Sequence, residues 1–452
     1  MSFAASFIKI AKKVLPSPFS IAIILTVITA LLALLLTEPK ADTTQIHILQ
    51  IAQHWETGFW ELLKFTMQMM LILILGHVLA LSQAVNKLID GALRFCTNTA
   101  KAAFMVSLLS MVVALVNWGL GLVFGAIFAR KVGEFAQKNN IKLNYPLIGA
   151  AGYAGLMVWH GGLSGSAPLT ITESSHFLVD KMGVVPLSET IFSSMNIFAT
   201  IAVLVIIPAA MYWMGKNSDN EAYPLNLQTN TPTSQDKTAV TGAERIDYAH
   251  IVGYLLGGTM LTWAIYKAIK GISAGGGLSF LTLNYINFLL FGLGVLLHKN
   301  IHNFLQAVNT AIGGSTGIMI QFPLYAGIMG IMKYSGLIEV FSGFFVQISS
   351  DFTFPIFTFI SAGIVNVFVP SGGGQWAVQG PIIVEAAQQL GVSINKCVMA
   401  LAYGDQLTNM MQPFWALPLL GITGLKANEI LPYTLFLLLL GSIIFITTLL
   451  LF

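Results

Sequence analysis

The segment Ile364–Gln379, IVNVFVPSGGGQWAVQ, constrains the fold of this chain more than any other. Two mostly apolar runs flank Pro370 and the three consecutive glycines Gly372–Gly374. Proline removes a backbone donor and glycine exposes the backbone, so no regular helix is expected to continue through this point. Of the 452 residues, 56% are hydrophobic and only 9% are charged, which is typical of a helical membrane protein. Irregular backbone is tolerated at membrane depth only where it lines a cavity, so we predict the tip of a helical hairpin that contacts a solute.

Apolar segments of about 20 residues, long enough to cross a bilayer, recur along the chain. Spans are expected at Phe19–Leu36, Trp60–Ser82, Thr190–Met214, Ile251–Ile269, Leu278–Leu297, Leu305–Met332 and Leu431–Phe452. Two segments are expected to lie along the membrane surface, Ala84–Asn98 and Ser335–Ser350. Glu38–Glu56 is expected to be an outer loop. The cations Lys87, Arg94 and Lys101 follow the second span, and the positive-inside rule therefore places that side, with the N-terminus, in the cytoplasm.

One long hydrophilic segment, residues 215–248, divides the chain and is expected to be a cytoplasmic linker. The first half, residues 1–214, contains a predicted hairpin at 102–130 and an interrupted crossing at 145–169. The second half, residues 249–452, contains an extra span, the hairpin at 354–389 and an interrupted crossing at 396–422.

The two halves share short sequences at an offset of 249 or 250 residues (337 − 88 and 418 − 168), which indicates an internal repeat. The matching pairs are Leu88-Ile89-Asp90 with Leu337-Ile338-Glu339, Val116-Asn117 with Val365-Asn366, Tyr153 with Tyr403, and Pro168-Leu169 with Pro418-Leu419. An odd number of expected crossings separates the two hairpins. The second repeat is therefore expected to be inverted, with the hairpin tips meeting near the middle of the membrane. Paired interrupted segments of this kind mark the binding sites of secondary transporters.

Polar side chains gather at these interruptions, as the ligands of a transporter would. The residues predicted to bind a substrate are Asn117, Trp118, His160, Ser164, Ser166, Asn366, Ser371, Gly372, Gly373, Gly374 and Gln375. The residues predicted to couple transport to a cation are Asp405, Thr408 and Asn409. Unwound backbone offers N–H groups to an anion and carbonyl groups to a cation such as Na⁺, for which Asn117, Asn366 and Asp405 are the candidate ligands. A carboxylate in the apolar context of Asp405 is costly in lipid, so it is the strongest indication of ion coupling.

Each of these residues also has a purely structural alternative. Asn117 and Asn366 would cap the interrupted helices. His160 would be a hydrogen-bonded core histidine, and Asp405 would form a structural salt bridge. Gly313–Gly317 is expected to mark close helix packing rather than a binding site.

Two other functional classes are weighed against a transporter. Gly162–Gly165 matches the G-x-S-G surround of intramembrane serine proteases, which also need a histidine from another helix to activate the serine. A channel is the second class, because hairpins also line pores. No Walker, zinc-binding or dinucleotide-binding sequence occurs, which argues against ATP-driven transport. The net charge of +3 gives no indication of nucleic-acid binding.

The segments WHGGLSGSAPL (159–169), VPSGGGQWAVQGP (369–381) and AYGDQLTNMMQPFWALP (402–418) resemble the bacterial short-chain fatty acid transporter family, of the acetoacetate and butyrate permease type. The similarity extends along nearly the whole chain, and the family looks related to a superfamily that includes sodium:dicarboxylate symporters. The resemblance implies a homodimer in which each protomer has a scaffold domain and a moving, elevator-type transport domain with two hairpins. The dicarboxylate relatives carry Ser-Asn-Thr at their hairpin tips. This chain has Asn-Trp-Gly and Pro-Ser-Gly-Gly-Gly instead, which fits a smaller, monovalent substrate.

The sequence and the resemblance together predict an all-α polytopic protein of the bacterial inner membrane. We expect a secondary active transporter that moves short-chain monocarboxylates, such as butyrate or acetoacetate, by symport with H⁺ or Na⁺. A dicarboxylate or other organic-anion transporter on the same scaffold is the alternative. The expected partners are a small organic anion, the lipid bilayer and a second copy of the chain, and no cofactor is expected beyond Na⁺ as a coupling ion.

Overall fold

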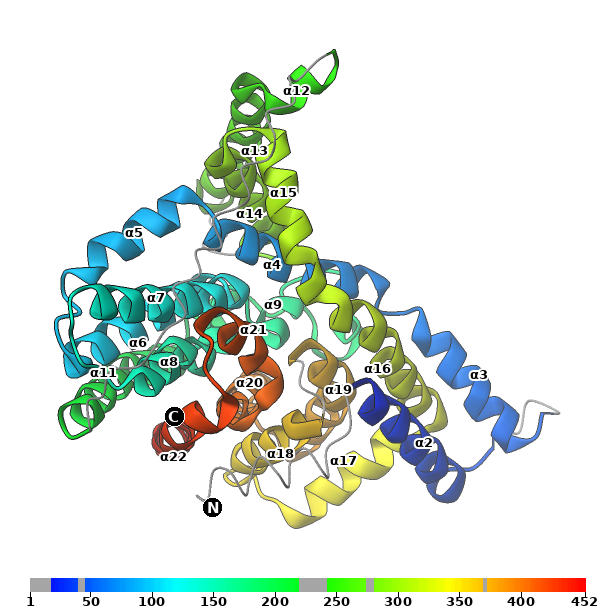
Figure 1. Cartoon of the computed structure of the whole chain (residues 1–452). Coiled ribbons are helices and arrows are strands. Elements are labelled where there is room, and N and C mark those ends of the chain that lie inside the picture. Colours follow the sequence, from blue (N-terminus) through cyan, green and yellow to red (C-terminus); the bar gives the residue numbers. More distant parts are fainter. Residues whose placement is uncertain (1–17, 40–44, 219–241, 274–279, 369–371) are drawn as a thin grey trace.

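The computed structural model describes residues 18–39, 45–218, 242–273, 280–368 and 372–452, and these ranges consist of helices joined by turns (Figure 1). The first half contains α2 (Pro18–Leu36), α3 (His47–Phe59), α4 (Leu63–Ala80), α5 (Gln83–Leu93), α6 (Thr99–Val116), α7 (Trp118–Lys138), α8 (Tyr145–Tyr153), the 3₁₀ turns η1 (Ala154–Met157) and η2 (Trp159–Gly161), α9 (Ser166–Thr170), α10 (Val179–Met182), η3 (Leu187–Glu189) and α11 (Ser194–Lys216). The second half contains α12 (Glu244–Tyr248), α13 (His250–Ser273), α14 (Leu283–His298), α15 (Ile301–Ala311), η4 (Ile312–Ser315), α16 (Thr316–Ser335), α17 (Leu337–Ile348), α18 (Phe354–Phe368), α19 (Gly372–Leu390), α20 (Ile394–Thr408), η5 (Asn409–Met411), α21 (Pro413–Thr423) and α22 (Ala427–Leu451).

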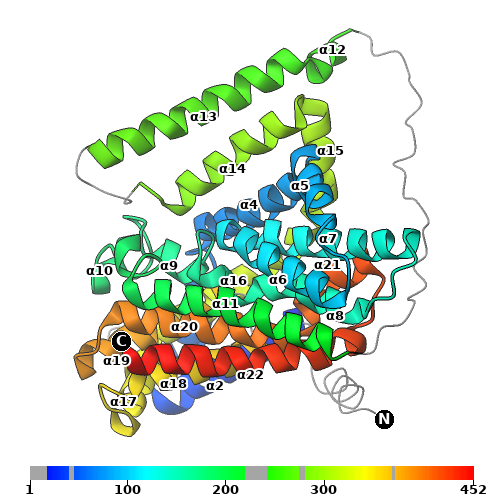
Figure 2. The ribbon, with the colours of Figure 1, turned by 90° about the vertical axis from the view of Figure 1, so that its left-hand side faces the viewer.

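Several of these helices have the length and composition of membrane spans. Among the described residues, five qualify, namely α4, α6, α11, the continuous segment Ile301–Ser335 and α22. The axes of the helices α11, α20 and α22 lie roughly parallel to one another, and α13 lies tilted on the far side of the molecule (Figure 2). Large apolar side chains such as Ile201, Ile265 and Ile443 remain exposed on their outer faces, where lipid would cover them. The chain therefore has the all-helical, multi-pass character that the sequence predicts.

Two helix pairs fold back on themselves where the sequence is interrupted. α6 ends at Val116 and α7 begins at Trp118, with Asn117 in an extended conformation between them. Oδ1 of Asn117 accepts a hydrogen bond from the N–H of Leu120 at 2.8 Å and so caps α7. α18 ends at Phe368 and α19 begins at Gly372. The segment between them, which includes the predicted site residue Ser371, lies outside the described residues.

The two predicted crossings are also irregular in the middle. α8 ends at Tyr153, and 3₁₀ turns follow until α9 begins at Ser166, whereas α20 passes through η5 into α21. Gly162 permits the first irregular segment, because a side chain there would collide with the backbone of Leu115 in α6. The N–H of Leu163 donates to the carbonyl oxygen of Leu115 at 2.7 Å. The unwound segment is therefore fastened directly to the first hairpin.

One close contact occurs in both halves of the chain. Gly155 in η1 lies against the carbonyl oxygen of Ser110 in α6, and Gly404 in α20 lies against the carbonyl oxygen of Phe359 in α18, with no space for a side chain at either glycine. The two contacts differ by 249 residues in both members (404 − 155 and 359 − 110), which is the offset of the sequence matches. The helices α5 and α17, which form most of the two predicted surface segments, lie toward opposite ends of the bundle (Figure 2).

The sequence predicts an outer loop at Glu38–Glu56, but this region instead contains most of the helix α3. α3 packs along α16, and Gly58 meets Gly330 backbone to backbone. Trp55 covers Gly327 one turn away. The segment is too short and polar to be recognised as a span, but these glycine contacts hold it against the bundle.

The close helix packing expected at Gly313–Gly317 does not occur at Gly313 or Gly314. A Cβ on Gly313 would have nothing within 4 Å, and one on Gly314 would approach only a methyl group of Leu73, at 3.8 Å. The glycines instead form the 3₁₀ turn η4, which separates α15 from α16. The predicted span Leu305–Met332 is therefore interrupted at this turn.

Candidate functional site

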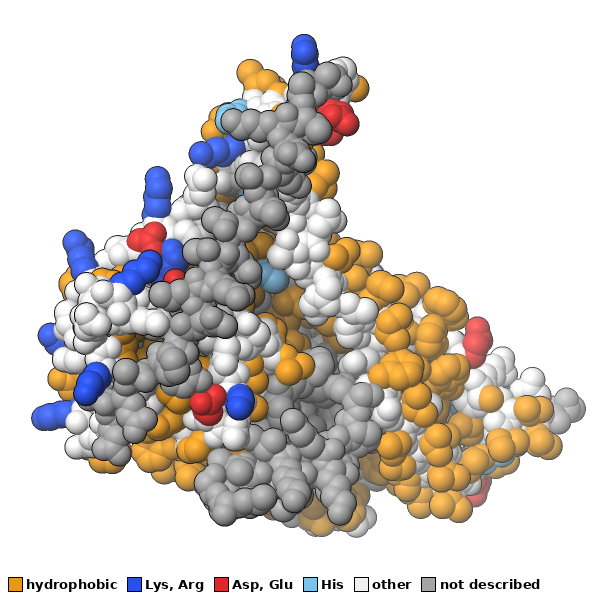
Figure 3. Space-filling model, in the orientation of Figure 1, with side chains coloured by type: hydrophobic (Ala, Val, Ile, Leu, Met, Phe, Trp, Pro, Cys, Tyr) orange, Lys and Arg blue, Asp and Glu red, His pale blue; other side chains and the backbone are white. Residues whose placement is uncertain are grey.

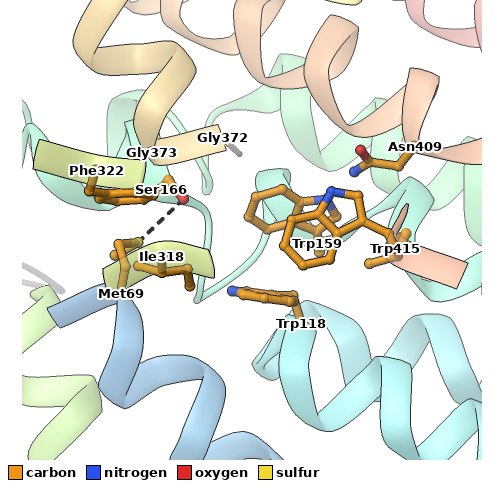
Figure 4. Close-up of a pocket in the computed structure, with 11 residues that line it drawn as sticks. Met69, Trp118, Trp159, Ser166, Ile318, Phe322, Gly372, Gly373, Asn409 and Trp415 are labelled. Carbon is orange, nitrogen blue, oxygen red and sulfur yellow. Dashed lines mark hydrogen bonds between the residues drawn. The ribbon is translucent and has the colours of Figure 1, made fainter. Parts of the chain in front are cut away.

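A small cavity lies where both hairpins and both interrupted crossings converge (Figure 4). It is lined by Met69, Trp118, Leu156, Trp159, Ser166, Ile318, Phe322, Gly372, Gly373, Asn409 and Trp415. Trp118 comes from the break in the first hairpin, and Gly372 and Gly373 come from the start of the second helix of the other hairpin. The cavity volume is about 20 Å³, enough for one water molecule, which needs about 10–15 Å³. In this conformation the cavity is closed around a space smaller than an organic acid.

The walls of the cavity are mostly apolar and aromatic. The rings of Trp118 and Trp159 lie 5.8 Å apart, and Trp415 meets Trp118 edge to face at 5.1 Å. α4 and α16 close the other side with apolar side chains, and the hydroxyl of Ser166 points to the sulfur of Met69 at 3.5 Å (Figure 4). No lining side chain is charged. The indole N–H of Trp159 is buried and has no hydrogen-bond partner, so it is a donor available to a ligand.

A histidine–aspartate pair lies directly behind this cavity. Nδ1 of His160 is 2.8 Å from Oδ2 of Asp405, and the two side chains are 0% and 1% exposed. The N–H of Ala167 donates to Nε2 of His160 at 3.1 Å. Nε2 must therefore carry a lone pair, which places the ring proton on Nδ1, where it is donated to Asp405. His160 is thus the donor, and Oδ2 of Asp405 is the acceptor of this bond.

Gly372 brings the second hairpin onto this pair. A Cβ on Gly372 would lie 2.8 Å from Cε1 of His160 and from Cη2 of Trp159, and 3.1 Å from Oδ2 of Asp405. The ring of Trp159 stacks on that of His160 at 4.4 Å. Gly372 and Trp159 also line the cavity. Gly372 and Trp159 therefore line the cavity and also contact the buried His160–Asp405 pair. Only a glycine at position 372 leaves room for the second hairpin to come this close.

Buried oxygen atoms without donors occur on Asp405 and on two residues in its hydrogen-bond network. They are Oδ1 of Asp405, Oδ1 of Asn366 and Oε1 of Gln412. The amide nitrogen of Asn366 donates to the carbonyl oxygen of Asp405 at 2.6 Å and to oxygens of Thr408 and Asn409 at 2.9 Å, and Gln412 donates to the carbonyl oxygen of Asn366. Unsatisfied acceptors are uncommon in protein interiors, and a carboxylate among them is costly. A proton or a small cation would supply the missing partner.

The remaining predicted residues have structural partners. Asn117 uses both polar groups, because it caps α7 and its amide nitrogen donates to the carbonyl oxygen of Ile72 in α4 at 3.1 Å. The hydroxyl of Ser164 accepts the N–H of Trp118 at 2.8 Å. Gln375 donates to the carbonyl oxygen of Ala362 at 2.8 Å, within the second hairpin. None of these three residues lines the cavity.

The structure thus separates the predicted residues into groups. Trp118, Ser166, Gly372, Gly373 and Asn409 line the cavity. His160, Asn366, Asp405 and Thr408 form the hydrogen-bonded cluster behind it. Gly374 packs against Tyr325. Of the three candidate Na⁺ ligands, Asn366 and Asp405 are joined, whereas Asn117 is held by α4 on the other hairpin.

Sequence reasoning missed most of the apolar lining of the cavity. Met69 comes from α4, which carries no local sign of a site, whereas Ile318 and Phe322 come from the start of α16, just after the glycine turn η4 and before Pro323. Trp159 and Trp415 lie within the motifs already noted, next to His160 and after Gln412. Trp159 lies in an irregular segment and Trp415 lies near the start of a helix, and these positions were the sequence signal that could have identified them.

Solved structures with the same fold are membrane transport proteins. The chain matches MtrF of Neisseria gonorrhoeae, described within a class of antimetabolite efflux pumps, with a TM-score of 0.61 and 15% identity over 96% of this chain and 95% of that one. It matches the YdaH transporter of Alcanivorax borkumensis with a TM-score of 0.56 and 15% identity over 95% and 97% of the two chains. The fold is therefore one that membrane transporters use.

Sequence comparisons narrow this class. The family model for short chain fatty acid transporters matches residues 1–452. Two proteins that bear the name of a short-chain fatty acid transporter, from Escherichia coli (strain K12) and Haemophilus influenzae (strain ATCC 51907 / DSM 11121 / KW20 / Rd), are 37% and 34% identical over 442 and 446 residues. These alignments cover 97% and 96% of this chain and 96% of each relative. The chain belongs to the short-chain fatty acid transporter family, which confirms the predicted family and the expectation that it is not an enzyme.

Proposed function

We propose that this chain carries short-chain monocarboxylates, such as butyrate or acetoacetate, across the bacterial inner membrane by symport with H⁺ or Na⁺. The observation that carries the proposal is Asp405, a buried carboxylate beside the cavity whose Oδ1 has no donor. An ionised carboxylate with an unsatisfied oxygen is costly inside a membrane protein. A proton or Na⁺ on Asp405 removes this cost, so the site itself favours the presence of a cation.

The lining of the cavity suits one small carboxylate. Its head group would find the indole N–H of Trp159, the hydroxyl of Ser166 and the N–H groups of Gly372 and Gly373 at the start of α19. Its short tail would contact the tryptophan rings and Phe322. A second carboxylate would meet no cationic side chain in this lining, which favours monocarboxylates over dicarboxylates. Binding requires the closed cavity to widen, and movement of α19 relative to α16 would widen it.

The geometry also gives a reason for coupling. The cation would bind on one side of Gly372 and Trp159 and the substrate on the other, so the two charges would be close. Opposite unit charges about 4 Å apart attract by about 4 kcal/mol at an effective dielectric constant of about 20. This is about a thousandfold in affinity, and linkage requires each ligand to strengthen the other equally. Without the cation, the charge of Asp405 repels the substrate.

We include an inverted repeat, an elevator-like movement and a homodimer in the proposal. The equal offset of the Gly155–Ser110 and Gly404–Phe359 contacts supports the repeat, as do the opposite positions of α5 and α17. In an elevator the hairpins and interrupted crossings would move as one body against α4 and α16. The mostly apolar contact of the cavity lining with α4 and α16 supports such sliding.

Uptake of radiolabelled butyrate into proteoliposomes tests the proposal. Three conditions are compared, namely an inward Na⁺ gradient at equal pH, an inward H⁺ gradient at equal Na⁺, and no gradient. Passive entry of the protonated acid is measured in protein-free liposomes and subtracted. Saturable accumulation under one gradient supports symport, whereas failure of both gradients to drive accumulation overturns it. Competition by succinate as strong as that by butyrate would favour the alternative organic-anion transporter.

A further inference from the structure

A second cavity lies between the end of α5, the first turns of α6 and the last turns of α11. Its volume is about 530 Å³, within the range of about 300–1,000 Å³ that ligand pockets occupy. Arg94 and Lys101 supply positive charge to its lining, and Phe104, Met105 and Tyr212 supply aromatic and apolar surface. In Figure 3, Lys and Arg side chains gather over the part of this face where α5, α6, α7 and α11 lie. None of the five lining residues named here belongs to the transport cavity.

The two cations in this cavity are not neutralised by the protein. Within the described part of the chain, neither Arg94 nor Lys101 has a carboxylate at ion-pair distance. Asp90, one turn before Arg94 on α5, is paired with Lys131 at 2.6 Å. The guanidinium of Arg94 lies 4.8 Å from the ring centre of Phe95, which orients it without cancelling its charge. The cavity therefore keeps a positive potential that favours an anion.

The order of side chains along the cavity matches the polarity of a membrane surface. α6 and α11 pack against each other, and both are long and apolar enough to span a bilayer. Lys101 lies in the first turn of α6, and Phe104 and Met105 follow one turn deeper. Tyr212 lies four residues before the end of α11 at Lys216. Cations at the helix ends with aromatic side chains just inside them form the arrangement that contacts lipid head groups and the adjoining acyl chains.

We infer that this cavity binds an anionic glycerophospholipid. The phosphate would lie between Arg94 and Lys101, and the first part of an acyl chain would lie along Phe104, Met105 and Tyr212. The size of the cavity and its long apolar wall fit a lipid better than a four-carbon acid. Arg94 is the C-terminal cap of α5 and Lys101 belongs to α6. A bound lipid would therefore link α5 to α6, the first helix of the first hairpin.

Native mass spectrometry of the delipidated full chain, titrated with phosphatidylglycerol and separately with phosphatidylcholine, tests this inference. We expect one phosphatidylglycerol to bind more tightly than phosphatidylcholine. The double variant Arg94→Gln/Lys101→Gln should weaken phosphatidylglycerol binding about thirtyfold, since each cation near the membrane surface contributes about 1 kcal/mol, or about fivefold. Ala209→Trp, which fills the apolar side of the cavity, should weaken binding of both lipids.

The matched control is Lys138→Gln/Lys142→Gln, which removes two exposed cations from the segment between α7 and α8 and should leave both affinities unchanged. Size-exclusion profiles and melting temperatures establish that every variant is folded. Wild-type affinity for phosphatidylglycerol in the Arg94/Lys101 variant overturns the inference. Equal binding of the two lipids by the wild type, or displacement of phosphatidylglycerol by low concentrations of octanoate, also overturns it, the latter in favour of a fatty-acid site.

Discussion

Replacing Asp405 with Asn separates the charge of this residue from its structural role. The amide oxygen of Asn can still accept the bond that Nδ1 of His160 donates to Oδ2, and the NH₂ group replaces Oδ1, the atom without a donor. Asp405→Asn should therefore fold and resist heat nearly as well as the wild type. Asp405→Ala leaves the His160 donor buried and unpaired, which costs about 1–3 kcal/mol, so it should melt at a lower temperature.

The functional effect of Asp405→Asn should be a loss of coupling. A tenfold cation gradient is worth about 1.4 kcal/mol. A carrier that moves one cation with each substrate can therefore accumulate butyrate up to about tenfold. Asp405→Asn mimics the neutral carboxyl, so accumulation should fall to the outside concentration while exchange of labelled for unlabelled butyrate continues.

The assay measures both activities in the same proteoliposomes, with protein-free liposomes as the blank. Asp351→Asn is the matched control, because it removes an exposed carboxylate and should leave accumulation and exchange unchanged. Wild-type accumulation by Asp405→Asn would refute the assignment of coupling to this residue. Loss of exchange together with a large fall in melting temperature would show that Asp405 is mainly structural.

Three further outcomes are expected. Phe322→Ala removes a ring from the cavity wall and should favour hexanoate over butyrate by about tenfold in competition assays, because each of the two extra methylene groups is worth about 0.8 kcal/mol when buried. An unchanged ratio of hexanoate to butyrate affinity would contradict the assignment of Phe322 to the wall. Gly372→Ala places a methyl group 2.8 Å from ring atoms of the site and should raise the KM for butyrate about tenfold, as overpacking costs about 1–3 kcal/mol, whereas Gly91→Ala, which meets nothing within 4 Å, should have no effect. Burial lowers the pKa of His176 from 6.5, and its Nδ1 accepts the N–H of Leu178. The stability that the neutral ring gives the loop after α9 should therefore be present above pH 6.5 and be lost progressively below it. Hydrogen exchange in this loop that does not rise below pH 6.5 would be inconsistent with this.

Local sequence signals account for most of the helix ends near the site. Asn117 ends one helix and caps the next, because its side chain acts on the backbone directly. α18 ends two residues before Pro370 as expected, but Gly372, Gly373 and Gly374 belong to the first turn of α19 rather than to the break. α3 could not be predicted in this way. Its helix is too short for a span, and Gly58 holds it against Gly330, a partner far along the chain that no local pattern identifies.

The candidate site was predictable as a set of segments but not as a set of contacts. The interruptions marked which residues would be near one another, and the structure brings His160 and Asp405 to 2.8 Å. Which of these residues contact one another depends on how the two halves of the chain pack together, and local sequence patterns do not show this. Asn117 and Asn366 lie at matching positions in the proposed repeat, but Asn117 is held by α4, whereas Asn366 binds the end of α20 beside Asp405. Equivalent positions therefore carry unequal chemistry.

The hydrogen bonds between the halves bear on how a bound solute and its cation would move. The His160–Asp405 bond joins the first interrupted crossing to the second. The hydroxyl of Tyr153, at the end of α8, donates to the carbonyl oxygen of Asn409 at 2.9 Å, and the hydroxyl of Tyr403, in α20, donates to Asn196, whose amide in turn holds the carbonyl oxygen of Gly161.

These bonds tie the two interrupted crossings into one unit, and both the proposed cation ligands and the Trp159 wall belong to it. By contrast, the unit meets α4 and α16 at the cavity through Met69, Ile318 and Phe322, side chains that form no strong hydrogen bond there. If the unit slides together with the first hairpin, it breaks these apolar contacts and the hydrogen bond from Asn117 to Ile72 in α4, and it keeps Asp405 beside the substrate. The pairing of charges that makes binding cooperative would then persist through the whole movement, which is the condition for a cation gradient to drive the acid across the membrane.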